Sequence, residues 1–173
     1  MDISYLDKNS IKIRSKHAAF VVDPPVSGPK ISCDAIVLLE YKDNLLSKVV
    51  DYRIVINGPG EYEINSAKVM GVRVNKGFVY SLSFDGLEIT MGRTSDIAKI
   101  KDNAFSCQIA ILNVDDELSA SIITNLEPKI VILYGDNKEN GAKILGKENL
   151  LPAKKLTISK DKLPEDMEVV GLG

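Results

Sequence analysis

The spacing of apolar residues changes near residue 106, and this change limits the possible folds more than any other feature of the sequence. Before it, short strand-like segments follow one another with only turn residues between them. Asp85-Gly86 is a strong two-residue hairpin signal between two such segments. The spacing predicts an antiparallel meander within a larger sheet, with strands at about 68–74, 77–84 and 87–91.

After residue 106, apolar strand segments alternate with helical spacing. Strands are expected at 108–114 and 129–133, and helices at 116–126 and 140–145. A β-α-β-α order predicts parallel strands joined by right-handed crossovers. Without a linker or an internal repeat, the sequence predicts one mixed α/β domain over residues 1–173.

Composition excludes several classes of protein. Of the 173 residues, 45% are hydrophobic and 27% charged, which is typical of a folded domain. The 22 basic and 24 acidic residues argue against a nucleic-acid partner, which would favour a basic domain or stripe. No apolar run approaches the ~20 residues that span a bilayer, and the acidic start is unlike a signal peptide. A cytoplasmic protein is expected, with Cys33 and Cys107 as free thiols.

Histidine content restricts metal chemistry. His17 is the only histidine, and with two cysteines the chain has three Cys and His residues in total. A multi-histidine zinc centre and a Cys/His zinc knuckle are therefore both excluded. We expect His17 to lie at the surface, in a hairpin between strands at 10–14 and 18–22.

Several segments of the sequence form a specific series in chain order. They are Val22-Asp23-Pro24, Ser27–Lys30, Asp34–Leu39, Ile56–Ile64, Met91–Thr94 and Glu127–Ile132. The most specific part reads Gly58-Pro59-Gly60-Glu61-Tyr62-Glu63, a stretch whose glycines otherwise predict a tight turn. Together the segments resemble the metallo-β-lactamase-fold superfamily, in particular its small Zn-dependent hydrolases and ascorbate-6-phosphate-lactonase-like members. The resemblance implies a four-layer αβ/βα sandwich with two mixed β-sheets.

The residues that bind zinc in that family are replaced here. Zinc hydrolases need about three protein ligands and one open position, whereas leucine offers no donor and arginine repels a cation. We therefore predict no metal, no other cofactor and no catalytic residue of the family's kind. By the resemblance, the former metal-ligand positions are Tyr41, Asp43, Leu45, Leu46, Arg93 and Tyr134, the last with Gly135 as an alternative.

Two functions remain open. The first is a degenerate, non-catalytic protein that binds or scaffolds, as a homo-oligomer, with an active relative, or by holding a small anionic ligand at Asp43, Arg93 and Tyr134. In that case Arg93 is expected to pair with Asp43 or Asp96. The second is a hydrolase of a small ester, lactone or phosphoester that uses no metal or a rebuilt carboxylate site. Candidate oxygen ligands are Glu40, Asp43, Asp96, Asp115, Asp116 and Asp136.

Two clusters of charge have simpler interpretations. Asp115 and Asp116 are expected to cap the helix that follows them. Lys12, Arg14 and Lys16 form a small basic edge, which we interpret as a solvated strand face that discourages edge pairing.

Overall fold

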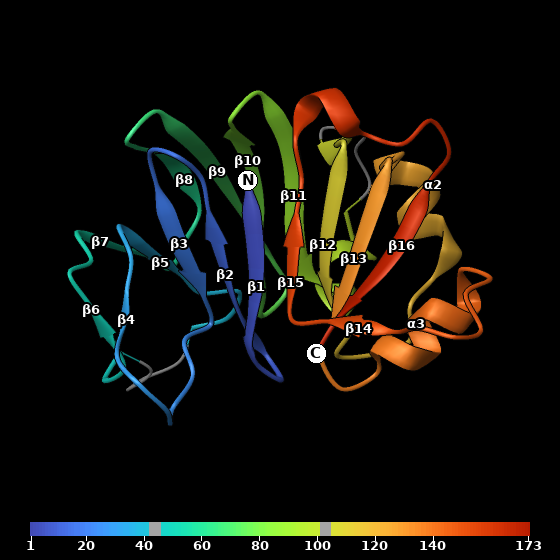
Figure 1. Ribbon diagram of the computed structural model, residues 1–173, viewed down its shortest axis with the longest axis horizontal. Helices are drawn as coiled ribbons and strands as arrows, with labels where there is room; N and C mark the ends of the chain where they lie inside the picture. Colours follow the sequence, from blue (N-terminus) through green and yellow to red (C-terminus); the bar gives the residue numbers. More distant parts are fainter. Residues whose placement is uncertain (42–45, 101–104) are drawn as a thin grey trace.

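Two β-sheets packed face to face form the body of the molecule in the computed structural model (Figure 1). The structure describes residues 1–41, 46–100 and 105–173. The first sheet has six strands, in the spatial order β15 (Lys155–Thr157), β1 (Asp2–Asp7), β2 (Ser10–Arg14), β3 (Ala19–Val22), β5 (Ala35–Val37) and β7 (Ile54–Ile56).

The second sheet joins the two patterns seen in the sequence. Its β8–β11 portion is the expected antiparallel meander, and from β11 onward the neighbouring strands run parallel. The predicted change from hairpins to crossovers is therefore confirmed. In spatial order the strands are β14 (Pro152–Ala153), β16 (Glu168–Leu172), β13 (Ile130–Tyr134), β12 (Ile109–Asn113), β11 (Leu87–Arg93), β10 (Gly77–Phe84), β9 (Ala67–Val74) and β8 (Gly60–Ile64).

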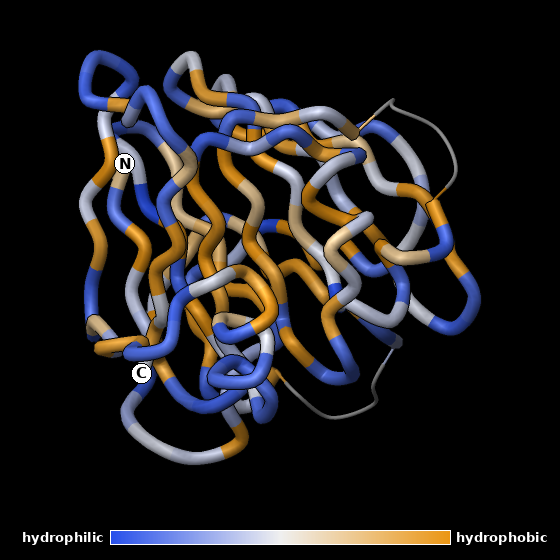
Figure 2. Tube along the Cα trace, turned by 90° about the vertical axis from the view of Figure 1, so that its right-hand side faces the viewer, coloured by the Kyte–Doolittle hydropathy of each residue, from blue (hydrophilic) through white to orange (hydrophobic). Residues whose placement is uncertain are grey.

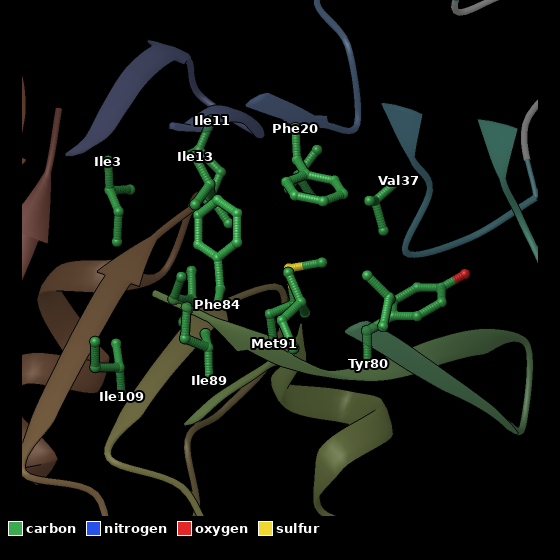
Figure 3. Packing of buried hydrophobic residues seen from close by; sticks show 14 of the residues in the cluster. Ile3, Ile11, Ile13, Phe20, Val37, Tyr80, Phe84, Ile89, Met91 and Ile109 are labelled. Atoms are coloured by element: carbon green, nitrogen blue, oxygen red, sulfur yellow. The ribbon is translucent and has the colours of Figure 1, made fainter. Parts of the chain in front are cut away.

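The main core lies between the two sheets. Alternate residues of each strand point inward, so Ile3 and Ile13 of one sheet share a core cluster with Ile89 of the other (Figure 3). Phe20 and Phe84 touch edge to face across the interface, with ring centroids 5.5 Å apart. Such a pair adds about 1 kcal/mol beyond its buried area. Figure 2 shows hydrophobic residues along the strands and hydrophilic ones at many of the turns.

Short helices cover the outer face of the eight-stranded sheet, three of them within the described residues. They are α1 (Thr94–Ile97), α2 (Ala120–Leu126) and α3 (Lys138–Ile144), and α2 and α3 lie at the right of Figure 1. Ile122 of α2 and Ala142 of α3 pack with Leu112 and Leu133 of the sheet. In the described ranges, no helix has the length and apolar character needed to cross a membrane.

A small two-stranded sheet covers the outer face of the six-stranded sheet. Strands β4 (Ile31–Ser32) and β6 (Val49–Val50) pack there around Ile36 and Cys33. The expected mixed α/β sandwich is thus confirmed. Among the described residues, the layer outside the six-stranded sheet consists of the strands β4 and β6. A 3₁₀ helix, η2 (Lys160–Lys162), precedes β16.

Candidate functional site

Three polar residues stand side by side where the parallel strands end. Arg93 pairs in register with Asn113, and Asn113 with Tyr134, at the ends of β11, β12 and β13. The positions two residues earlier, Met91, Ile111 and Ile132, all belong to the core between the sheets. Because side chains alternate along a strand, the three polar residues occupy the last inward-facing position of each strand.

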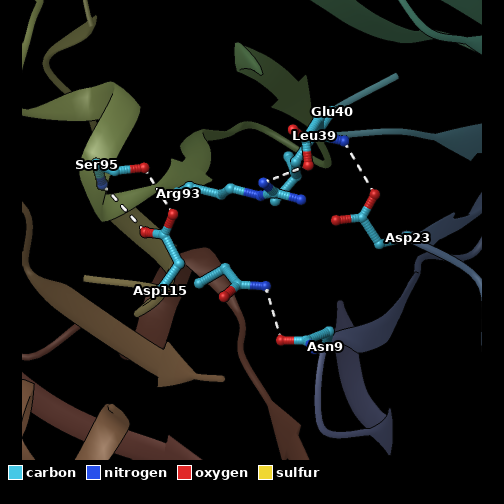
Figure 4. A network of polar contacts seen from close by, with 8 residues as sticks. Asn9, Asp23, Leu39, Glu40, Arg93, Ser95 and Asp115 are labelled. Atoms are coloured by element: carbon cyan, nitrogen blue, oxygen red, sulfur yellow. Dashed lines mark hydrogen bonds and ion pairs between the residues drawn. The ribbon is translucent and has the colours of Figure 1, made fainter. Parts of the chain in front are cut away.

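The guanidinium of Arg93 reaches the segment that follows β5, where Glu40 forms a β-bridge with Gly77 at the start of β10. Its Nη1 donates to Oε2 of Glu40 at 2.6 Å, with the two side chains 16% and 31% exposed (Figure 4). Burial acts to lower the pKa of Arg93, but the hydrogen bond and charge of Glu40 and the charge of Asp23 outweigh it and raise that pKa. Arg93 is therefore a permanent cation in this edge of the molecule.

Two further polar contacts hold the same edge together. The Asn113 Nδ2 donates to Oδ1 of Asn9, in the turn between β1 and β2, at 3.4 Å. The buried Asp23 accepts the backbone N–H of Leu39 at 3.1 Å, which fixes the chain just after β5. Hydrogen bonds and an ion pair therefore tie together the chain segments at this edge of the two sheets.

Asp115 corrects one expectation from the sequence. Its carboxylate accepts hydrogen bonds from Ser95 N at 3.1 Å, Ser95 Oγ at 2.6 Å and Thr94 Oγ1 at 3.0 Å. It thus holds the start of α1, whereas α2 is capped by Ser119. The prediction that Asp115 and Asp116 cap the following helix was wrong, because the chain stays non-helical as far as Ser119. Burial acts to raise the pKa of Asp115, but the hydrogen bonds from Ser95 and Thr94 hold it below its ordinary value.

Tyr134 lies in the core beneath this edge and does not line an open pocket. Its side chain is fully buried, and its hydroxyl has no hydrogen-bond partner among the described residues. Burial, followed by the charge of Asp23, raises the pKa of Tyr134, while the nearby Asn113 amide lowers it without reaching hydrogen-bond geometry. The adjacent Gly135 has φ of +99°, and a Cβ there would lie 2.6 Å from Asn113 Oδ1. Glycine is needed at this turn for both reasons.

A small pocket opens above these residues. We call it the Arg93 pocket; its volume is about 230 Å³. Its carboxylates already have partners, since Glu40 pairs with Arg93, Asp136 with Lys8, and Asp115 with the start of α1. Over the described ranges, no three Cys, His, Asp or Glu side chains gather as a metal-binding group. The lining residues are Asn9, Glu40, Arg93, Asn113, Asp115 and Asp136.

The two remaining candidate acids lie apart from the lining of the pocket. Asp96 is only 4% exposed; burial raises its pKa, while the charge of Arg93 lowers it. From the sequence, Arg93 is expected to pair with Asp43 or Asp96. Of these two, only Asp96 lies within the described residues, and Arg93 forms its ion pair with Glu40 instead. Among the described residues, the carboxylate of Asp116 accepts the N–H of Glu117 at 2.8 Å, while its backbone carbonyl accepts Thr94 Oγ1 at 3.2 Å.

The former metal-ligand positions are only partly brought together. Arg93 and Tyr134 are neighbours through Asn113, but Tyr41 is 62% exposed on the loop after Glu40. Leu46 packs against the outer cluster of the six-stranded sheet. Asp43 and Leu45 lie outside the described residues. Sequence reasoning missed Asn9 and Asn113 as site residues. Asn113 could have been found, because it follows the inward-facing residues Ile109 and Ile111 at the end of the same strand.

The described donor set does not suit the zinc ion that the resemblance implies. Position 93, which the resemblance makes a former metal-ligand position, carries a guanidinium, and its partner Glu40 is engaged in neutralising it. The phenol of Tyr134 is sealed in the core, and burial favours its neutral form. A zinc-bound water needs anionic or imidazole ligands around an open position, whereas the carboxylates that line the Arg93 pocket are engaged by Arg93, Lys8 and Ser95.

Comparison with known proteins supports the fold. No protein-family model matches the chain, and no curated protein sequence matches it. Among solved structures, a Thermotoga maritima protein assigned to the Zn-dependent hydrolases of the metallo-β-lactamase superfamily superposes with a TM-score of 0.77 at 16% identity, over 99% of this chain and 97% of that one.

Two further structures agree. A protein from Parabacteroides distasonis, assigned as a metal-dependent hydrolase, gives a TM-score of 0.60 at 17% identity, over 99% of this chain and 93% of that one. An isothiocyanate hydrolase from Delia radicum gut bacteria gives a TM-score of 0.60 at 8% identity, over 91% of this chain and 99% of that one. Likeness at such identities speaks for the architecture alone. The chain therefore has the fold of the metallo-β-lactamase superfamily.

Proposed function

We propose that this protein is a non-hydrolytic member of its fold, in which an ion-pair network has replaced the metal centre and the function is binding or scaffolding. The observation that carries the proposal is the Arg93–Glu40 pair, at 2.6 Å, at the ends of β11 and β5. A cation at this place repels Zn²⁺, and the carboxylate that could attract the metal is already neutralised.

The surrounding contacts support a structural role for the network. Asp115 is engaged by Ser95 and Thr94, and Asp136 by Lys8. A carboxylate that accepts several hydrogen bonds gains little by exchanging them for a metal ion, whose binding would first have to break them. The network therefore stabilises the edge between the sheets in place of the coordination that relatives are built for.

A hydrolysis assay tests the loss of catalysis. We expect purified protein to leave lactone, thioester and phosphoester substrates at their uncatalysed rates, both after EDTA treatment and after incubation with Zn²⁺. A working zinc hydrolase in the same assay controls for the substrates. Turnover that rises with Zn²⁺ and disappears with EDTA would contradict the proposal.

A rebuilt carboxylate metal site is the alternative with an observation in its favour. Glu40, Asp115 and Asp136 line one pocket, and oxygen ligands suit Mg²⁺ and Mn²⁺. Repeating the assay with these ions separates the two functions. Activity that depends on Mn²⁺ or Mg²⁺ and is lost in Asp136→Asn, but kept in Asp116→Asn, would establish the hydrolase.

The binding role has two forms in this proposal. Association with a second copy or with an active relative is measured by light scattering after gel filtration, and a strictly monomeric protein at all concentrations would remove the homo-oligomer. A small anionic ligand at Arg93 has weaker support, because Glu40 already neutralises the guanidinium and Tyr134 is closed off by the core.

A further inference from the structure

A second pocket lies at the opposite end of the six-stranded sheet. It opens between the turn joining β2 to β3 and the residues that precede β5 and β7. Because β3, β5 and β7 run parallel, their starts share one edge, while Glu40 and the Arg93 pocket follow the end of β5. We call this opening the basic pocket. The residues of its lining used below are Lys12, Arg14, Lys16, Asp34, Asp51 and Arg53.

Positive charge dominates the basic pocket. Four Lys and Arg side chains line it against two carboxylates, although the whole chain carries a net charge of −2. One of the carboxylates, Asp34, is occupied: it accepts Ala19 N at 2.9 Å and Asn65 Nδ2 at 3.0 Å. In the part of the chain that the structure describes, none of the four cations forms an ion pair.

Two of the cations are held in place by neutral partners. Lys12 Nζ donates to the carbonyl of Ser32 at 2.6 Å, and Arg53 Nη1 donates to Oδ1 of Asn65 at 3.3 Å. These contacts use one donor of each group and leave the charge uncompensated. An ammonium has three donors and a guanidinium five, so both keep N–H groups for a ligand. The sequence alone suggested only a solvated strand face here, because Arg53 and the pocket wall come from distant segments.

Size and donor type define the ligand. The pocket volume is about 490 Å³, within the usual range of roughly 300–1,000 Å³ for small-molecule sites. Guanidinium groups match the oxygens of a phosphate in bidentate fashion, and lysines add point charge. We propose that the basic pocket binds a small phosphorylated molecule, with Arg14 and Arg53 contacting the phosphate and Lys12 and Lys16 balancing its charge. This site shares no lining residue with the Arg93 pocket, so either proposal can fail alone.

Calorimetric titration with pyrophosphate at low ionic strength tests the inference. We expect saturable one-to-one binding that weakens with added salt, and a loss of affinity of about tenfold in Arg14→Gln and in Arg53→Gln. Arg73→Gln, an exposed arginine of β9 outside both pockets, is the matched control and should bind like the parent. Both pocket arginines are exposed, so the substitutions leave the core intact; thermal unfolding verifies this, and Lys16→Gln gives a third variant.

The outcomes separate the possible sources of the signal. Tighter binding of a sugar phosphate than of inorganic phosphate, lost in the same variants, supports a phosphorylated metabolite-sized ligand. Equal binding of the two places the recognition in the phosphate group and still supports the site. No saturable binding, binding unchanged in Arg14→Gln and Arg53→Gln, or preference for a single-stranded oligonucleotide over every small phosphate would overturn the inference.

Discussion

At the scale of single residues, the Arg93–Glu40 ion pair is the cross-link that our proposal sets in place of a metal site. The guanidinium is the cation of this cross-link, and Glu40 is its counter-ion. Such a partly buried pair is costly to break from one side, because removal of either member leaves a desolvated charge. Under our proposal, this pair stabilises the edge of the sandwich and leaves no open coordination position of the kind that zinc-dependent hydrolysis needs.

The contribution of the Asp115 carboxylate to stability can be tested by its dependence on pH. Its pKa is held below the ordinary 3.8, so the folded state favours the ionised carboxylate and its stabilisation is present above that value. The stabilisation is lost as pH falls through the lowered pKa. We expect Asp115→Asn to reduce the free energy of unfolding by about 1 kcal/mol at pH 7, a small value because water screens this exposed group.

Urea unfolding of the parent and Asp115→Asn at a series of pH values measures the effect. The difference between them should shrink as the pH falls below 3.8 and through the lowered pKa, and should change no further below it. Asp116→Asn, whose carboxylate contacts only the next residue, should match the parent throughout. A difference for Asp115→Asn that stays constant down to strongly acidic pH would show that the charge is irrelevant to this contact.

At the scale of elements, the turn after β13 brings the backbone at Gly135 close to the side chain of Asn113. Gly135 combines a positive φ of +99° with a Cβ position 2.6 Å from Asn113 Oδ1, whereas Gly146 has φ of +76° and open space around it. We expect Gly135→Ala to cost about 3 kcal/mol of unfolding free energy, because it adds a clash to the strain, and Gly146→Ala about 1 kcal/mol. Equal costs in urea denaturation would contradict the close approach at Asn113.

The order of elements could be predicted because it depends on local patterns. Hairpin signals such as Asp85-Gly86 and the alternation of strand and helical spacing after residue 106 match β8–β13 in the structure. The site could be predicted only in part. Arg93 was identified through the resemblance, but its pairing with Glu40 depends on how the two sheets approach, which strand periodicity does not encode. The role of Asp115 likewise depends on where α2 begins.

At the scale of the whole molecule, the two ends of the sandwich carry different electrostatic character. The end that holds the Arg93 pocket is rich in carboxylates that are already paired, while the opposite end holds unpaired cations. Apolar side chains between the sheets hold the core together, so residues at either edge can change without loss of the fold. Our two proposals together assign binding to surface sites at these edges.

The central claim is that this chain offers no zinc site, and metal analysis tests it most directly. The measurement is elemental analysis of protein purified without chelators and then dialysed against excess Zn²⁺ and buffer, with a zinc hydrolase of the same fold treated in parallel. We expect far less than one zinc per chain and no rise in melting temperature with Zn²⁺. One tightly held zinc per chain, retained through dialysis, would contradict the account.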